Sequence, residues 1–179
     1  MKYNPLIHHR KSVRLKDYNY SNAGAYFITI CTHEGERLFG KIKDEEMLLN
    51  EIGQIAYNEW LKTPEIRHNV TLVVFTIMPN HMHGILLLEE TIKTPNVAVN
   101  NMSVPTLPKF RSPSNNIGAI VRGYKSAVTK QANLMNFGGS VWQRNFHEHI
   151  IRDEASYQKI SAYIIDNVAT WHEDKFYKE

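Results

Sequence analysis

Two histidines, separated by one residue, interrupt the most apolar part of the chain. The run VTLVVFTIMPNHMHGILLLEE places His81 and His83 between two segments rich in branched and apolar side chains, which reads as buried β-sheet. Because side chains alternate between the two faces of a strand, both imidazoles are expected on one face and Met82 on the other. The pair predicts a metal site whose remaining ligands come from elsewhere in the chain or from a substrate.

The length and composition predict one folded domain over residues 1–179, because 42% of the 179 residues are hydrophobic. No apolar run is long enough to cross a membrane, and Cys31 is the only cysteine, so we expect no membrane span, no disulfide and a reducing cytoplasm. Composition sets apart three segments: a basic N-terminal arm at 1–22, a flexible loop at 90–116 that is rich in proline, and a polar C-terminal tail at 168–179.

The remaining segments alternate between strand and helix patterns. We expect strands over 24–35, 38–42, 70–78 and 84–88, an amphipathic helix within 48–63 with Asn50 as a possible cap, and helices over about 117–133 and 154–167. The segment SVWQRNFHEHII is expected to be a strand or an irregular arm. This order predicts an α+β fold.

Tyr124 is the second candidate for chemistry, because it lies on the apolar stripe of the helix that begins at Ile117. Arg122 and Lys125 flank it, and Gly123 would allow a close approach of the backbone to a ligand. A phenol ionises more readily near cations and a metal, so Tyr124 is a candidate nucleophile. A core tyrosine with an ordinary packing role is the competing interpretation.

The chain resembles the HUH single-tyrosine transposases, and among them the branch of REP-associated tyrosine transposases. The stretches that carry the resemblance follow the order of that family: RKSVRLKDYNYSNAGAYFITICT, LFGKI, MPNHMHGILLL, IGAIVRGYKSAVTK, VWQRNFHEHIIRDE and YIIDNVATWHEDKF. The resemblance implies a ferredoxin-like antiparallel sheet with helices on one face and the histidine strand in the centre. It also implies cleavage and rejoining of hairpin-containing single-stranded DNA through a covalent 5′-phosphotyrosine, with Mg²⁺ or Mn²⁺, in the nucleoid of a bacterial cytoplasm.

By this resemblance His81 and His83 would bind the metal and Tyr124 would be the nucleophile. Relatives often have a glutamine ligand one helical turn after the tyrosine, where this chain has Val128, so the third ligand is open. Gln131 lies on the same helix face, but about 10 Å beyond Tyr124. The candidates for this third ligand are therefore His149, Glu148, water and a substrate oxygen. Asn167-Val168 replaces the Asn-Pro pair that is common in relatives, and we expect this change to alter a turn only.

The basic residues predict where DNA binds, because clustered cations suit a polyanion. An ordinary solvated basic surface is the competing interpretation. The predicted DNA-binding residues are Arg10, Lys11, Arg14, Lys16, Arg122, Lys125, Arg144 and His149. A second metal site at His147 and His149 is a further hypothesis.

Three functions remain open: a metal-dependent tyrosine transposase, a domesticated hairpin-binding protein of the same fold that has lost cleavage, and an unrelated metal-dependent hydrolase. Either a monomer or a homodimer is compatible with the resemblance.

Overall fold

The computed structural model describes residues 18–90 and 116–177. The first part contains β1 (Gly24–Cys31), η1 (His33–Gly35), β2 (Gly40–Lys43), β3 (Glu46–Leu49), α1 (Glu51–Leu61), α2 (Thr63–Ile66), β4 (Val70–Met78) and β5 (His81–Leu88). The second part contains α3 (Ile117–Leu134), β6 (His147–Ile151), α4 (Glu154–Asp166) and η2 (Trp171–Glu173). The predicted basic arm lies outside the described residues except for 18–22, and the predicted loop lies outside them except at its two ends.

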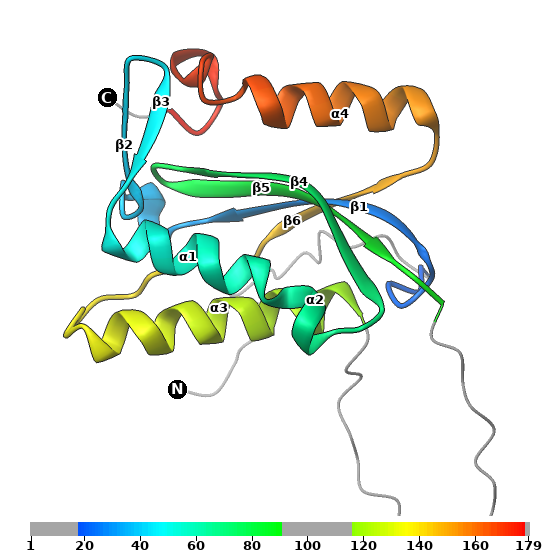
Figure 1. Ribbon diagram of the computed structural model, residues 1–179, viewed down its shortest axis with the longest axis horizontal. Coiled ribbons are helices and arrows are strands. Elements are labelled where there is room, and N and C mark those ends of the chain that lie inside the picture. The colour runs from blue at the N-terminus through cyan, green and yellow to red at the C-terminus, as the bar shows by residue number, and fades with distance from the viewer. Residues whose placement is uncertain (1–17, 91–115, 178–179) are drawn as a thin grey trace, which may run out of the picture.

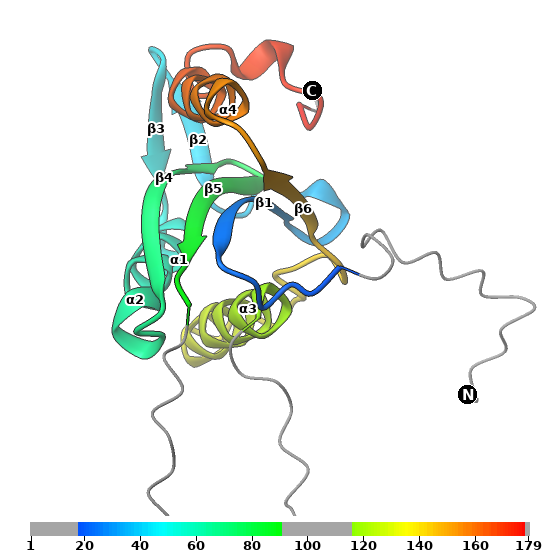
Figure 2. The same ribbon diagram turned by 90° about the vertical axis from the view of Figure 1, so that its right-hand side faces the viewer.

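A four-stranded antiparallel sheet with the order β4-β5-β1-β6 organises the domain, so the histidine strand β5 is central, as predicted. Without the β2–β3 hairpin, the elements follow the β-α-β-β-α-β order of ferredoxin-like domains. The prediction that the helices pack on one face is wrong. In Figures 1 and 2, α1 and α3 cover one face of the sheet and α4 covers the other.

Two hydrophobic clusters follow from this arrangement. The larger one lies between the sheet and the helices α1 and α3, and includes Tyr26, Met82, Trp60 and Tyr124. The smaller one lies under α4 and contains Ile85, Ile151 and Ile164. Alternation along β5 therefore sends Met82 and Leu86 toward α1 and α3, and sends His81, His83 and Ile85 toward α4.

The helix limits agree closely with the sequence pattern, whereas β3 is a strand that the pattern does not predict. Asn50 caps α1, since its Oδ1 accepts from the backbone N–H of Gly53 at 2.9 Å. Leu49, which the helical spacing includes in this helix, instead ends β3 and pairs with Gly40 in the small hairpin. None of the described helices is both long enough and apolar enough to cross a bilayer.

Candidate metal centre

His81 and His83 lie side by side in the space between the sheet and α4. Both side chains are fully buried, and their ring centroids are 4.4 Å apart. The pair sits at the start of β5, directly after a tight connection in which Met78 pairs with His81 across the β4–β5 hairpin. The regular pairing of both residues with β1 keeps the two rings on the same face, as the period of two predicts.

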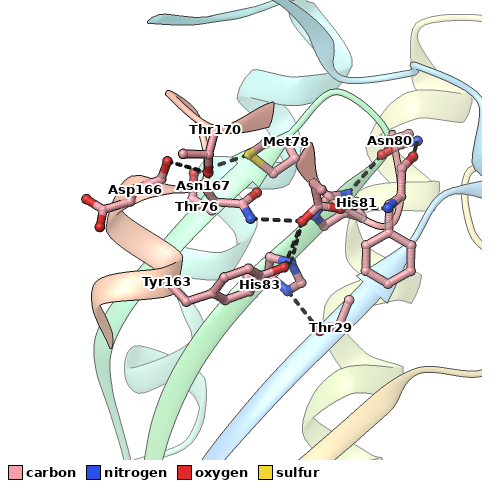
Figure 3. A network of polar contacts seen from close by, with 12 residues as sticks. Thr29, Thr76, Met78, Asn80, His81, His83, Tyr163, Asp166, Asn167 and Thr170 are labelled. Atoms are coloured by element: carbon pink, nitrogen blue, oxygen red, sulfur yellow. Dashed lines mark hydrogen bonds and ion pairs between the residues drawn. The ribbon is translucent and has the colours of Figure 1, made fainter. Parts of the chain in front are cut away.

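Neighbouring polar groups orient the two imidazoles (Figure 3). His81 Nδ1 is 2.9 Å from Asn80 Oδ1, and His83 Nδ1 is 2.8 Å from Thr29 Oγ1. The Asn80 amide is itself held, because its Nδ2 donates to the carbonyl of Phe176 at 2.8 Å. The Asn80 oxygen only accepts, so His81 carries its proton on Nδ1 and leaves the Nε2 lone pair for a metal. The Thr29 hydroxyl can donate or accept, so His83 can hold its proton on Nε2 toward Asp174 in the metal-free site and on Nδ1 when Nε2 binds a metal.

Asp174 adds a carboxylate to the pair. The potential ligand atoms of His81, His83 and Asp174 lie within 4.8 Å of one another. The Asp174 side chain is only 1% exposed. Within the described residues, His81 Nε2 is buried without a hydrogen-bond partner. A buried nitrogen with a free lone pair, next to an imidazole and a carboxylate, fits a divalent metal that keeps open positions for substrate.

Tyr163 and Asn167 complete this cluster from α4 and the residue after it. The Tyr163 hydroxyl lies 3.1 Å from His83 Nε2 and donates to Asp174 Oδ2 at 2.7 Å. Asn167 donates from Nδ2 to the same carboxylate oxygen at 2.9 Å, and its own Oδ1 is a buried acceptor without a partner among the described residues. Figure 3 shows the Tyr163 phenol pointing to His83. The structure thus brings a hydroxyl, two imidazoles and a carboxylate together.

Burial determines the electrostatics of the site. It lowers the pKa of His81 to about 3, with a further contribution from His83, and it also lowers the pKa of His83. Burial alone would raise the pKa of Asp174, but hydrogen bonding to His83 and Asn167 holds it well below its usual range. Burial raises the pKa of Tyr163, and its hydrogen bond to Asp174 raises it further. The apo site therefore holds neutral histidines, an ionised Asp174 and a protonated phenol at neutral pH.

The metal-free protein is expected to lose stability as the pH falls from 7 to 5. The ordinary pKa of His81 is 6.5, so the unfolded chain binds a proton in a range where the folded protein does not. The neutral His81 side chain therefore costs the folded protein nothing above about pH 6.5, and the unfolding free energy falls as the pH drops from there toward pH 3. By pH 5 the decrease due to His81 is about 2 kcal/mol. Urea unfolding at the two pH values measures this loss.

A histidine outside the site provides the control for this titration. His81→Gln should remove the part of the pH dependence that comes from His81 and leave the part from His83, whereas His33→Gln, whose side chain is 45% exposed, should leave all of it in place. An unfolding free energy that does not change between pH 7 and pH 5 would contradict a buried neutral pair.

Tyr124, which the family resemblance gives as the nucleophile, does not lie with the histidine pair in this structure. It lies with Met82 and Trp60 in the large cluster on the other face of the sheet. The Tyr124 hydroxyl donates to the carbonyl of Ala56 at 3.1 Å, and burial raises its pKa well above the usual value. Val128 is buried in the same cluster, so its inability to bind a metal does not bear on the histidine site.

Tyr124→Phe is expected to have a modest effect on stability only. The change removes one buried hydrogen bond to a carbonyl at the middle of α1, which costs about 0.5–1.5 kcal/mol of unfolding free energy. Chemical unfolding measures this, and the variant should bind metal like the wild type. Loss of metal binding without loss of folding would show that Tyr124 communicates with the site.

The other predicted residues are dispersed. The described chain does not include Arg10, Lys11, Arg14 or Lys16. Arg122 and Arg144 are exposed, whereas the Lys125 ammonium donates to the carbonyls of Gln143 and Asn145. His149 is exposed on β6, opposite Phe27.

The β6 residues lie apart from the cluster at His81 and His83. Among the described residues, the one cluster of potential metal ligands includes neither His147 nor His149. Glu148 pairs with Ile28, whose side chain belongs to the large cluster, so it is directed away from the histidine pair. Gln131, on α3, also lies on the far side of the sheet.

Sequence reasoning missed Tyr163, Asn167 and Asp174. A signal existed for the first two: they are four residues apart near the end of a predicted helix, and therefore lie on one helix face. Asp174 gave no comparable signal, because it lies after η2 in a segment that composition marks only as a polar tail.

Comparison with known proteins gives the family and the fold. No protein-family model matches the sequence. An uncharacterized protein of Haemophilus influenzae strain Rd is 44% identical over 176 residues, covering 98% of this chain and 97% of that protein. The chain belongs to the family of this Haemophilus protein. A solved structure of a REP-associated tyrosine transposase bound to a REP hairpin has a TM-score of 0.59 and 19% identity, over 92% of this chain and 77% of that one. This similarity confirms the transposase-like fold.

Proposed function

We propose that this protein is a metal-dependent tyrosine transposase that cleaves and rejoins single-stranded DNA at hairpins. The observation that carries the proposal is the Tyr163 hydroxyl 3.1 Å from His83 Nε2, at the edge of the cluster of His81, His83 and Asp174. A phenol beside a group of metal ligands is the arrangement that a phosphotyrosine mechanism requires. Tyr163 takes the role that the family resemblance gives to Tyr124.

The chain supplies the nucleophile and its orientation. The Tyr163 oxygen forms a bond to the scissile phosphorus as the bond from phosphorus to the leaving 3′-oxygen breaks. The products are a 5′-phosphotyrosine and a free 3′-hydroxyl. Asp174 accepts the hydrogen bond of the phenol at 2.7 Å and so fixes the direction of its lone pairs. Because the pKa of Asp174 is depressed, it is a weak base, and we assign the phenol proton to water.

A bound divalent ion would polarise the phosphate and favour ionisation of the phenol. The residues that would hold it are His81, His83 and Asp174, and the free Oδ1 of Asn167 lies next to Asp174. Asn167 follows Tyr163 by four residues, which is the position that the family resemblance gives to the third ligand. Two imidazoles suit Mn²⁺ better than Mg²⁺, which prefers oxygen ligands. We therefore propose Mn²⁺ as the better cofactor of the two.

Hairpin-containing single-stranded DNA is the proposed substrate. The structural relative was solved with a REP hairpin, and the present chain has the same fold over 92% of its length. The basic arm with Arg10, Lys11, Arg14 and Lys16 remains a candidate for contacts with the hairpin phosphates, as do Arg122 and His149 on the described surface.

A second candidate is a hairpin-binding protein with little cleavage activity. The Phe176 ring lies 4.7 Å from the His81 ring, and Asp174 already engages the Tyr163 hydroxyl, so the C-terminal segment covers part of the site. Strong binding with slow cleavage would follow if this segment stays in place.

One assay separates these candidates. The protein is incubated with an end-labelled hairpin oligonucleotide that carries single-stranded extensions, with Mn²⁺ or with a chelator. The transposase proposal predicts a labelled protein band that survives denaturation, requires the metal and is reversed by added 3′-hydroxyl strand. Binding without such a band supports the binding protein, and cleavage without a covalent band contradicts the tyrosine mechanism.

A further inference from the structure

Two cavities meet beside the metal centre at Gln143 and Arg144. The first, of about 610 Å³, is lined by Asn80, Lys175, Phe176 and Tyr177 together with the two shared residues. The second, of about 680 Å³, runs along α3 past Lys125 and Lys130 and is lined by the same two residues. Each is within the range of about 300–1,000 Å³ typical of ligand sites. Because Asn80 also orients His81, the first cavity opens next to the histidine pair.

Backbone hydrogen bonds hold the junction in place. The Gln143 N–H donates to the Cys31 carbonyl at 3.0 Å, and the His33 N–H donates to the Val141 carbonyl at 3.0 Å. The Lys125 ammonium donates to the carbonyl of Gln143 from the other side. The segment before Arg144 is thus tied both to the end of β1 and to α3, which leaves the exposed Arg144 side chain between the two cavities.

The lining is cationic with aromatic surface. Lys175, Arg144 and Lys130 are all exposed, and Tyr177 is 38% exposed next to the half-buried Phe176. Among the described residues that line the two cavities, Glu34 is the one carboxylate, and its Oε1 lies 3.7 Å from His33 Nε2. Cations next to the exposed ring of Tyr177 and the half-buried ring of Phe176 suit a single strand, whose phosphates pair with the cations while its bases stack on the rings.

We propose that these two cavities form one track for single-stranded DNA. The strand runs from the scissile phosphate past Phe176 and Tyr177, crosses Arg144 and continues to Lys130 on α3. This inference rests on the proposed function, because the track begins at the site of cleavage. Lys125 positions the track through its bonds to the backbone, and Arg144 and Lys130 contact phosphates. The contacts are to the backbone and to ring faces, so the track accepts many sequences.

Binding to oligonucleotides of increasing length tests the track without requiring cleavage. A fluorescent hairpin is prepared with 0, 2, 4, 6 or 8 unpaired nucleotides on its 5′ or its 3′ side, and its affinity is measured by anisotropy in a chelator. For one of the two sides, the wild type should bind at least tenfold more tightly as the extension grows. The protein with both Arg144→Gln and Lys130→Gln should bind the blunt hairpin normally but lose this gain in affinity. The slope of the logarithm of its binding constant against the logarithm of salt concentration should be shallower by about 0.7 per lost phosphate contact.

Lys41→Gln on β2 is the matched control, because Lys41 is exposed and lines neither cavity. A gain with extension length that survives in the double variant, or that falls equally in Lys41→Gln, would overturn the track. The result is separable from the proposed function. A covalent adduct with an unaltered length dependence rejects the track alone. A length dependence that requires Arg144 and Lys130, without any adduct, rejects the tyrosine chemistry and supports the track.

Discussion

Replacing Tyr163 with phenylalanine is expected to abolish covalent attachment to DNA and to reduce strand cleavage by on the order of 10³-fold or more. The phenol oxygen is the proposed nucleophile, and phenylalanine retains the ring that packs near His83 and Phe27. The change removes one donor from the buried Asp174 carboxylate, which keeps its hydrogen bond from Asn167. Gel analysis of a labelled hairpin substrate with Mn²⁺ measures both products, and anisotropy should show unchanged binding.

Tyr124→Phe provides the matched control, because it removes the same atom from the opposite face of the sheet. That variant should form the adduct at close to the wild-type rate, despite its small loss of stability. If Tyr124→Phe eliminates the adduct and Tyr163→Phe does not, the nucleophile is Tyr124, and the domain must rearrange or exchange α3 with a second chain to use it.

Replacing Asp174 with alanine is expected to weaken Mn²⁺ binding strongly. Loss of a residue that only hydrogen-bonds to a metal ligand usually lowers metal affinity about 10–100-fold, so loss of a ligand itself should lower the Mn²⁺ affinity at least as much. Asp174 also anchors Tyr163 and Asn167, so the change frees both side chains. Titration calorimetry or the loss of the free Mn²⁺ resonance signal measures the affinity, and circular dichroism verifies that the variant is folded.

Two further variants assign the role of this carboxylate. Asp174→Asn can still accept the hydrogen bond of Tyr163 but lacks the charge, so it should lose metal affinity while retaining an ordered phenol. Asp166→Asn alters an exposed acid on α4 and should leave metal binding unchanged. Faster cleavage in Asp174→Ala, with unaltered Mn²⁺ affinity, would contradict the ligand role and identify Asp174 as a group that obstructs the site.

Most of the fold could be predicted from local patterns. The apolar, strand-forming runs of β4 and β5 located the sheet, and the apolar stripe of α3 identified its buried side chains, including Ile117, Ile120, Tyr124 and Val128. Periodicity identifies which side of a helix is buried, but it does not identify which face of the sheet that helix covers. The family resemblance places Tyr124 with the histidines, but Tyr124 packs with Met82, which points away from the two imidazoles.

The ligand set could be predicted only in part. His81 and His83 share a face because they belong to one strand, a relation that spacing alone determines. Asp174 reaches them from 91 residues after His83 through the turn after α4 and the short helix η2, a contact set by tertiary packing of Trp171 and Phe176 against His81. Val128, at the position where the family resemblance expects a third ligand, lies in a different layer of the domain.

Mapping the amino acid that carries DNA tests the central proposal most directly. After reaction of the wild type with a hairpin substrate and Mn²⁺, the adduct is digested with nuclease and trypsin and analysed by mass spectrometry. Tyr163 is the only tyrosine in the tryptic peptide ISAYIIDNVATWHEDK, and Tyr124 is the only one in GYK. The proposal predicts a nucleotide phosphate on the first peptide. A nucleotide on GYK, or on neither peptide despite metal-dependent cleavage, would contradict it.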